Sequence, residues 1–505
     1  MYDDEQLTDP FDPTELEPDE FAQPSAKRGC LYLVVTSVIV ASLLLTSILA
    51  YFVVTSRENR TETGGELSRP IVIETGPTAA PATVVAAVAT TIPTAEPEPV
   101  AAIPDVNRIA LINGDGQIET MSPAGENRRV LTLESDNTRF QIPTWAPDGQ
   151  QVAIIGNRTV GGAIYVLDDV ARTGALRDHQ IYYSVDQSPV YLYWAPDSKT
   201  LGFLANQSRD LLSLNVVAGD GTAESRQLAT GAPFYWDWSD DGRQLLIHTG
   251  QRGAANSLAL INLDGRTQAD NLAIPGEFQA PGIGQGGRYW AFAEQGEGGL
   301  SSLVVVDTET GERSSHLEVG SLALSWSPAR DQIAFTKGAV NGHPYWGPLH
   351  LLDVTTGEER LISTRTVLAF FWSPDGRQIA FITLGSNNDD DSINAGAPQK
   401  SRHVSRLLGM PVAQPGQGFL TLSVVDVETG QGLRLLDFEP TVAFLAQFLP
   451  YFDQYALSHR IWSPDSSAIV LPVREDGRNS IVILSATGGR NHTLAEGEIA
   501  FWSHN

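Results

Sequence analysis

Two stretches in the second half of this 505-residue sequence gather side chains suited to ligand chemistry. One is the acidic run Asp389–Asp391, followed by a basic stretch with Arg402, His403 and Arg406, and the other is an aromatic stretch that ends at His459. Carboxylates and imidazoles are side chains that bind metal ions and small polar ligands. If these residues meet, the chemistry would be that of a small-ligand or metal sensor, or of an enzyme.

No catalytic motif accompanies these residues. The sequence contains no G-x-S-x-G nucleophile elbow, no H-E-x-x-H zinc motif, no C-x-x-C pair, no P-loop and no calcium loop. We therefore predict no catalytic residue, no metal site and no cofactor, and we predict that the chain is not an enzyme. The sensor or enzyme remains the alternative to a binding module.

A repeated ten-residue unit must position these stretches. Its pattern is Trp-Ser-Pro-Asp-Gly, two polar residues and an apolar triplet such as Ile-Ala-Phe, and the last copy is cut short by the end of the sequence. Successive copies start 40 to 49 residues apart, with one gap of 90 residues. A period near 40 residues with strand and turn content is typical of a β-propeller. The copies begin at Trp145, Trp194, Trp238, Ile283, Trp326, Trp372, Trp462 and Trp502.

Each repeat has the composition of four short strands. Pro presets the first turn residue, Asp bonds back to the backbone, and Gly tolerates a positive φ. The Trp is the largest apolar side chain available to fill the space between neighbouring sheets. Further along each repeat, an alternating run such as Leu303–Asp307 ends at a second turn that contains Gly.

This unit resembles the repeat of the TolB propeller and of the propeller domains in the prolyl oligopeptidase family. The resemblance covers Arg108 to Trp502, and six of the eight copies keep the Trp, the turn and the triplet together. It implies an all-β propeller, and it implies protein–protein contacts in the cell envelope. Only three residues follow Trp502, so we expect no hydrolase domain like that of the prolyl oligopeptidases.

The two ends of the repeat region predict the number of blades. Three strands, starting at Arg108, Gln117 and Arg129, lack an inner neighbour, and the last strand, Glu498–Trp502, lacks outer ones. Pairing these two fragments adds one blade to seven complete units, which gives an eight-bladed propeller without free sheet edges. Because the copy at Ile283 is degenerate, seven blades remain the alternative.

The N-terminal part predicts a membrane anchor. Residues Cys30–Thr55 form an uncharged apolar stretch that is long enough to cross a bilayer as a helix. We predict an acidic disordered tail (1–29), a transmembrane helix (30–55), a disordered linker rich in Thr, Pro and Ala (56–105) and the propeller (106–505). A cleaved signal peptide fits less well, because the leader before the apolar stretch is long and acidic.

The orientation of the anchor follows from its flanks. Lys27 and Arg28 precede the span and Arg57 and Arg60 follow it, so the positive charges alone do not decide. A short tail inside and a large domain on an extended spacer outside is the signal-anchor arrangement. We therefore expect a single-pass protein of a bacterial cytoplasmic (inner) membrane with the propeller outside the cytoplasm. The net charge of −27 disfavours nucleic acid as a partner.

Three insertions mark the expected binding face: Lys337–Pro348, Leu384–Gly418 and Asp437–Arg460. All three fall on the propeller face that carries the second-to-third strand loops and the crossovers between blades. The third has an apolar stripe with helix-like spacing, which must cover either the propeller's own channel mouth or a partner. The candidate binding residues are His343, Tyr345, Trp346, Asp389, Asp390, Asp391, Arg402, His403, Arg406, Phe444, Phe448, Phe452, Tyr455 and His459.

These observations predict a membrane-anchored propeller outside the cytoplasm that binds or scaffolds another envelope protein. The alternative is a small-ligand or metal sensor, or an enzyme, that uses the channel mouth.

Overall fold

The computed structural model describes residues 107–208, 210–251, 254–276, 280–297, 300–338, 345–385 and 419–505. All described residues belong to one compact unit, Glu98–Asn505. The predicted tail, membrane span and linker lie outside the described residues. Within the described ranges, no helix is both long and apolar enough to cross a membrane.

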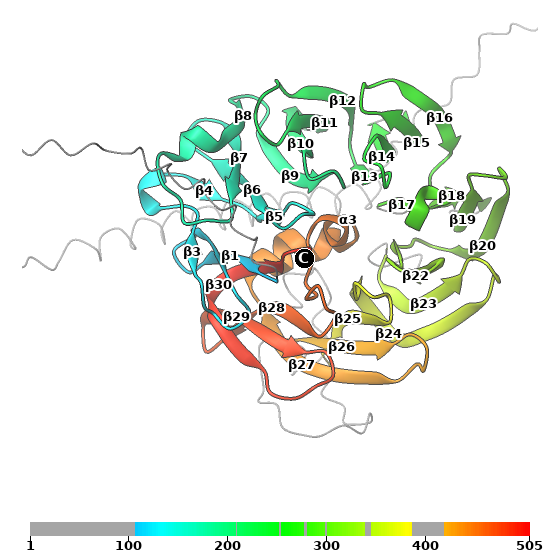
Figure 1. The fold of residues 1–505 in the computed structure, drawn as a ribbon. Coiled ribbons are helices and arrows are strands. Elements are labelled where there is room, and N and C mark those ends of the chain that lie inside the picture. Colours follow the sequence, from blue (N-terminus) through cyan, green and yellow to red (C-terminus); the bar gives the residue numbers. More distant parts are fainter. Residues whose placement is uncertain are drawn as a thin grey trace, which may run out of the picture. The chain divides into compact units, whose positions relative to one another are not determined.

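Antiparallel strands build this unit, as the sequence predicts, and Figure 1 shows their sheets arranged around a common centre. Four sheets follow one another along the first part of the chain. Their strands are β4 (Arg139–Phe140), β5 (Thr144–Trp145), β6 (Gln151–Asn157), β7 (Gly162–Asp168) and β8 (Gln180–Ser184); β9 (Pro189–Trp194), β10 (Thr200–Ser208), β11 (Leu211–Ala218) and β12 (Arg226–Gly231); β13 (Phe234–Trp238), β14 (Gln244–Gln251), β15 (Ala254–Asn262) and β16 (Thr267–Ala273); β17 (Gly282–Ile283), β18 (Tyr289–Gln295), β19 (Ser301–Asp307) and β20 (Arg313–Val319).

A fifth sheet of 13 strands joins the second half of the chain to its beginning. It is continuous because three long strands, β24, β27 and β30, each pair with one neighbour in their first part and with another in their last part. In spatial order its strands are β21 (Leu324–Trp326), β22 (Gln332–Thr336), β23 (Gly347–Asp353), β24 (Glu359–Trp372), β25 (Gln378–Leu384), β26 (Leu420–Asp426), β27 (Gly432–Pro440), β28 (Ala468–Glu475), β29 (Arg478–Ser485), β30 (His492–Trp502), β1 (Ile109–Asn113), β2 (Ile118–Met121) and β3 (Arg129–Val130).

The two ends of the repeat region pair as predicted. Strand β30 lies antiparallel to β1, with Trp502 opposite Ile109 and Ile499 opposite Ile112. Two further hydrogen bonds extend this pairing. Ser503 N donates to Arg108 O at 2.7 Å, and Arg108 N donates to the Ser503 side-chain hydroxyl at 2.9 Å. Within the described part of the chain, the last strand thus pairs with the first.

The turns after Trp145, Trp194, Trp238, Trp372 and Trp462 have the predicted positive φ, whereas Arg330, at the same position after Trp326, does not. Gly149, Gly242 and Gly376 have φ values of 70°, 66° and 66°. In two copies without Gly, Ser198 and Ser466 occupy the same position with φ values of 56° and 63°. Both serine hydroxyls accept a hydrogen bond from the backbone of an Asp in another Trp turn, which links neighbouring repeats. Serine therefore tolerates the unfavourable conformation here while adding a contact that glycine cannot make.

The Trp side chains also connect neighbouring repeats. In four copies the indole nitrogen donates a hydrogen bond to a backbone carbonyl of an adjacent repeat. The carbonyl belongs to the residue directly before the Trp of that repeat. The pairs are Trp145 with Phe501 (3.3 Å), Trp194 with Thr144 (3.3 Å), Trp372 with Ser325 (3.1 Å) and Trp462 with Phe371 (3.0 Å). The indole nitrogens of Trp238, Trp326 and Trp502 are buried and have no hydrogen-bond partner.

Candidate functional site

Seven of the predicted binding residues lie outside the described residues: His343, Asp389, Asp390, Asp391, Arg402, His403 and Arg406. The other seven are Tyr345, Trp346, Phe444, Phe448, Phe452, Tyr455 and His459, and each is buried or half-buried. Among the described residues, no three His, Cys, Asp or Glu side chains lie close enough together to hold a metal ion.

The third insertion forms a helical segment, which we call the central segment (Thr441–His459). It contains the π-helical turn η5 (Phe444–Phe448), the 3-10 turn η6 (Leu449–Tyr451) and the helix α3 (Phe452–Ser458), and α3 lies near the centre of the ring of sheets in Figure 1. The sequence predicted a helix-like stripe interrupted at Pro450, which is the second residue of η6. Residues Asp437–Pro440, assigned to the insertion, instead continue β27.

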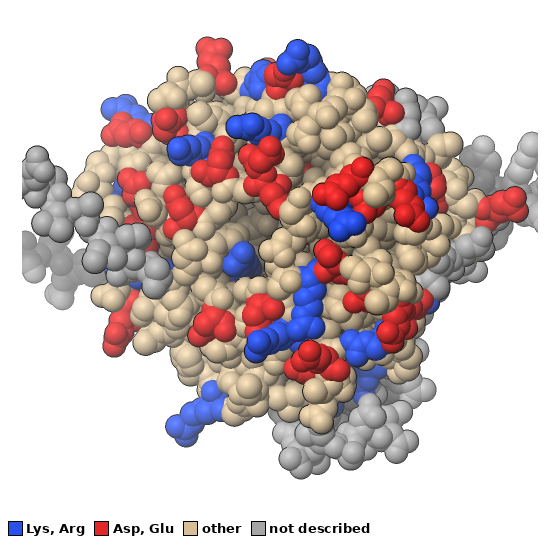
Figure 2. Space-filling view, turned by 45° about the vertical axis from the view of Figure 1, so that its right-hand side comes forward, with Lys and Arg blue, Asp and Glu red and all other residues tan. Residues whose placement is uncertain are grey.

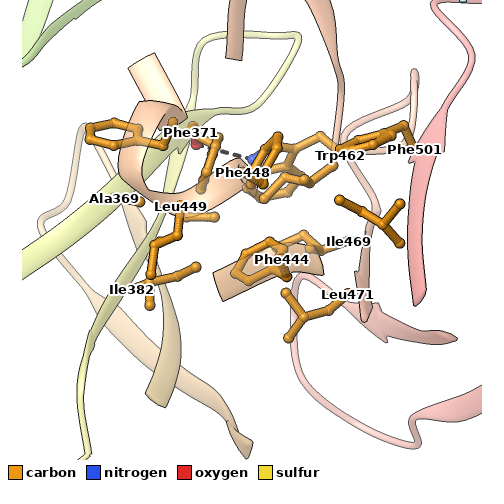
Figure 3. Packing of buried hydrophobic residues seen from close by; sticks show 14 of the residues in the cluster. Ala369, Phe371, Ile382, Phe444, Phe448, Leu449, Trp462, Ile469, Leu471 and Phe501 are labelled. Carbon is orange, nitrogen blue, oxygen red and sulfur yellow. Dashed lines mark hydrogen bonds between the residues drawn. The ribbon is translucent and has the colours of Figure 1, made fainter. Parts of the chain in front are cut away.

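The aromatic stripe of the central segment packs against the chain itself. Phe444 and Phe448 are fully buried and stack with their ring centres 5.2 Å apart, and Phe448 stacks on Phe371 at 5.8 Å. Figure 3 shows both rings among Trp462, Phe501 and aliphatic side chains of the surrounding strands. The sequence left open whether this stripe covers the propeller's own channel mouth or a partner. In the structure the rings are buried in the core of the chain itself. Phe444, Phe448 and Phe452 therefore form core and not an exposed binding surface.

Polar side chains anchor the same segment to two inner strands. Gln454 accepts a hydrogen bond from Trp236 N (2.8 Å) and donates to Trp236 O (2.9 Å). The Tyr191 hydroxyl donates to Gln454 O and contacts Ser458 Oγ at 2.7 Å, and Ser458 Oγ contacts His459 Nδ1 at 2.7 Å. Burial lowers the pKa of His459 to about 3, so its imidazole is neutral near pH 7.

A groove remains open where the central segment ends, and we call it the axial groove. It consists of a cavity of about 260 Å³ and an adjoining one of about 190 Å³, which share Trp326 and Leu457. Pro196, Pro328 and Pro374 of the Trp turns line it. The groove therefore opens on the face of the Trp turns and not on the face where the insertions led us to expect a site. Figure 2 shows a hollow near the centre of one face, with acidic and basic side chains around it.

Two buried carboxyl groups line the larger cavity, Asp237 and Asp453. Both oxygens of Asp237 are bonded: Oδ1 accepts from Trp238 N (2.9 Å) and the Tyr193 hydroxyl (3.2 Å), and Oδ2 accepts from Ile283 N (2.9 Å). Burial raises the pKa of Asp237 to about 7 despite these bonds. Asp237 thereby ties three neighbouring inner strands together.

Asp453 is different because only one of its oxygens is bonded. Its Oδ2 accepts a hydrogen bond from Ala280 N at 2.9 Å, whereas Oδ1 is buried without a hydrogen-bond partner. Burial raises the pKa of Asp453 to about 6, although the backbone N–H groups of Ala280, Gln454 and Asp453 itself act to lower it. When ionised, this carboxylate is an unused acceptor and a negative charge inside a cavity. When protonated, it is a proton donor.

Sequence analysis missed both carboxyl groups. Asp237 has a signal, because it stands between Trp236 and Trp238 in an inner strand where charged residues are otherwise uncommon. Asp453 has none that we recognise, since its contact with Ala280 spans 173 residues.

The comparisons with known proteins concern the fold. No family model and no curated protein matches the chain. Among solved structures, a putative TolB from Agrobacterium tumefaciens is 16% identical over 52% of this chain and 90% of its own, with a TM-score of 0.34. An oligogalacturonate lyase from Vibrio parahaemolyticus is 13% identical over 78% and 85%, with a TM-score of 0.38. Prolyl oligopeptidase B from Galerina marginata is 11% identical over 72% and 51%, with a TM-score of 0.44.

These matches correct one expectation. The sequence predicted that the chain is not an enzyme, on the ground that familiar catalytic motifs are absent. Several of the matched propeller structures are enzymes, including the lyase, the prolyl oligopeptidase and the dihydro-heme d1 dehydrogenase NirN. The prediction that the chain is not an enzyme was therefore wrong, because neither the absence of familiar motifs nor the propeller fold excludes catalysis. The resemblance to TolB-like β-propellers predicted from the Trp-turn units is confirmed for the fold, at low sequence identity.

Proposed function

We propose that this chain is a membrane-anchored binding module of a bacterial cell envelope, and that its partner protein enters the axial groove. The apolar stretch Cys30–Thr55 holds the chain in the cytoplasmic membrane, and the propeller lies outside the cytoplasm. The acidic net charge disfavours nucleic acid and anionic lipid surfaces as partners.

We further propose eight blades. Four blades correspond to the separate sheets β4–β8, β9–β12, β13–β16 and β17–β20. The 13-stranded sheet supplies four more if each of the long strands β24, β27 and β30 ends one blade and begins the next, as their divided pairing suggests. The degenerate copy at Ile283 contributes β17, the first strand of the sheet β17–β20. This supports counting the degenerate copy as a blade.

The observation that carries the proposed function is the position of the axial groove. The groove is lined by inner strands of several repeats and by the central segment. It is therefore a concave site where these elements meet. Concave sites that combine apolar walls with a few convergent polar groups are typical binding sites, and this groove has both, with the rings of Trp238 and Trp326 beside the carboxyl groups of Asp237 and Asp453. The central segment closes the space beside the groove with packed aromatic rings, which favours a site that holds a partner over a passage through the ring.

Recovery of partners from solubilised membranes tests this function. Leu457 is half-buried and lines both cavities, so Leu457→Trp should fill the groove without touching the Phe core. Leu361→Trp is the matched control, since Leu361 is an exposed leucine on β24. We expect an envelope protein that copurifies with the wild type and with Leu361→Trp to be lost from Leu457→Trp. Equal recovery by all three would overturn the groove as the binding site.

Protease treatment of intact spheroplasts tests the proposed location. The Pro- and Thr-rich residues 56–105 should be cut readily, releasing a fragment of about 40–45 kDa that contains the propeller. Protection of the propeller until the membrane is broken would reverse the orientation. A mature N-terminus beyond Ala50 would mean a cleaved signal sequence instead of an anchor.

A further inference from the structure

We propose that the larger cavity of the axial groove binds a positively charged side chain, an arginine or lysine of the partner protein, and that the carboxylate of Asp453 pairs with that charge. This inference rests on the proposed function and adds the chemistry of the group that is recognised. It follows from an unused acceptor, from two aromatic walls and from the charge of the molecule.

The unused acceptor is Asp453 Oδ1. Asp453 is 2% exposed and lines the cavity, and its Oδ1 has no hydrogen-bond partner although Oδ2 is bonded to Ala280 N. Buried polar atoms are almost always hydrogen-bonded, and a buried carboxylate oxygen without a donor is costly. An ammonium or guanidinium group supplies such a donor together with the opposite charge.

Asp237 does not compete for this role. Its two oxygens already accept three hydrogen bonds, from Trp238 N, the Tyr193 hydroxyl and Ile283 N. It acts as a positioning residue that holds the inner strands around the cavity. The two buried carboxyl groups therefore have different roles. Asp237 holds the inner strands that line the cavity, and Asp453 presents an oxygen without a hydrogen-bond partner.

The aromatic walls are Trp238 and Trp326. Both line the cavity, and both lack the hydrogen bond to an adjacent repeat that four other copies make. The degenerate repeat explains how Trp326 is accommodated: a Cβ on Gly282 would lie 2.5 Å from Trp326 Cδ1. A cation over the face of Trp is attracted by the ring quadrupole, and guanidinium groups stack well on such rings.

Charge and size favour a basic side chain over other occupants. The chain carries a net charge of −27, which raises the local concentration of cations around its clefts. A cavity of about 260 Å³ holds the end of one long side chain. Arg460 lines the adjoining cavity and not this one, and its Nη1 donates to His504 O at 3.3 Å.

Binding of a small probe tests the charge preference directly. N-acetylarginine amide should bind the detergent-solubilised full chain saturably, whereas N-acetylcitrulline amide, which has nearly the same shape without the charge, should bind at least about 10-fold more weakly. Asp453→Asn keeps an acceptor for Ala280 N and removes the charge, so it should weaken the arginine probe by about 10-fold or more. Asp168→Asn, at an exposed Asp that ends β7, is the control and should leave binding unchanged.

A second measurement uses only the wild type, which covers the case that Asp453→Asn fails to fold. The arginine probe should displace the recovered partner and the citrulline probe should not. No saturable binding of the arginine probe, or equal binding of both probes, would overturn the inference. If Leu457→Trp abolishes partner recovery while folded Asp453→Asn keeps it, this inference fails and the proposed function stands. If neither variant affects recovery, the proposed function itself fails.

Discussion

Gln454 in α3 binds the backbone of Trp236 in β13 through both ends of its amide, at 2.8 Å to the nitrogen and 2.9 Å to the oxygen. The side chain therefore satisfies an inner strand in the way that another strand would. The same amide nitrogen also donates to the Tyr191 hydroxyl at 3.2 Å. This relationship fixes the central segment against β9 and β13 and thereby positions Asp453, the preceding residue.

Replacing Gln454 should destabilise the propeller. Gln454→Ala removes both backbone contacts and leaves the buried Trp236 N and O without partners, so we expect the free energy of unfolding to fall by about 2–4 kcal/mol. Gln447 lies in the same segment but is exposed, and Gln447→Ala should change stability by less than about 0.5 kcal/mol. Denaturant unfolding of the two variants measures the difference, and similar losses would show that the amide does not anchor the segment.

The Trp hydrogen bonds between repeats predict a second difference. Trp462 and Trp502 are both fully buried, but only the Trp462 indole has an acceptor, Phe371 O. Trp→Phe removes similar packing at both positions, so Trp462→Phe should cost about 1 kcal/mol more than Trp502→Phe. Thermal or denaturant unfolding of the pair checks this, and equal losses would mean that the indole bond contributes nothing net.

The buried carboxyl groups make stability depend on pH. Burial raises the pKa of Asp237 to about 7 and that of Asp453 to about 6, whereas an unfolded Asp titrates near about 3.9. Between these values the folded chain binds protons that the unfolded chain releases. The resulting contribution to stability is complete below about pH 4 and is lost as the pH rises through about 6 and 7.

Asp453→Asn removes the Asp453 part of this contribution. Relative to the wild type, the variant should gain about 1–2 kcal/mol of stability between about pH 5 and about pH 7.5. Urea unfolding of both proteins at the two pH values measures it. A difference between wild type and variant that is independent of pH would contradict the raised pKa.

Deletion of Glu498–Asn505 tests the pairing of the two ends. The deletion removes the part of β30 that pairs with β1 and exposes a strand edge. We therefore expect the free energy of unfolding to fall by several kcal/mol, which is enough to prevent folding. Deleting eight residues within the predicted N-terminal tail (1–29) should leave the melting temperature unchanged. An unaltered melting temperature after the C-terminal deletion would mean that β1 does not need this partner.

The sequence predicts the scaffold well because the repeat determines it locally. After Trp145, Trp194, Trp372 and Trp462, a Pro, an Asp and a residue with positive φ determine the turn geometry locally. The strand at Glu498–Trp502 could be assigned to β1 by elimination. The hydroxyl bonds of Ser198 and Ser466 were not predictable in the same way. They depend on the distance to another turn, and the sequence of one repeat does not contain that distance.

The candidate site was predicted less well, because it depends on contacts between distant parts of the chain. Insertions indicated the opposite face, and seven candidate residues there lie outside the described part. The stripe at Phe444 and Phe448 was recognised as apolar, but its amphipathic pattern does not say what it covers. The axial groove exists because α3 ends where the degenerate repeat and its neighbours meet, and only the three-dimensional structure brings these elements together.

Photo-crosslinking from inside the groove tests the central claim most directly. A photoreactive amino acid is placed at Leu457 of the full-length chain in living cells, and a matched one at the exposed Leu361. The account predicts a discrete adduct with one envelope protein from position 457 and none with that protein from position 361. No adduct from position 457, or the same adduct from both positions in equal yield, would contradict the axial groove as the binding site.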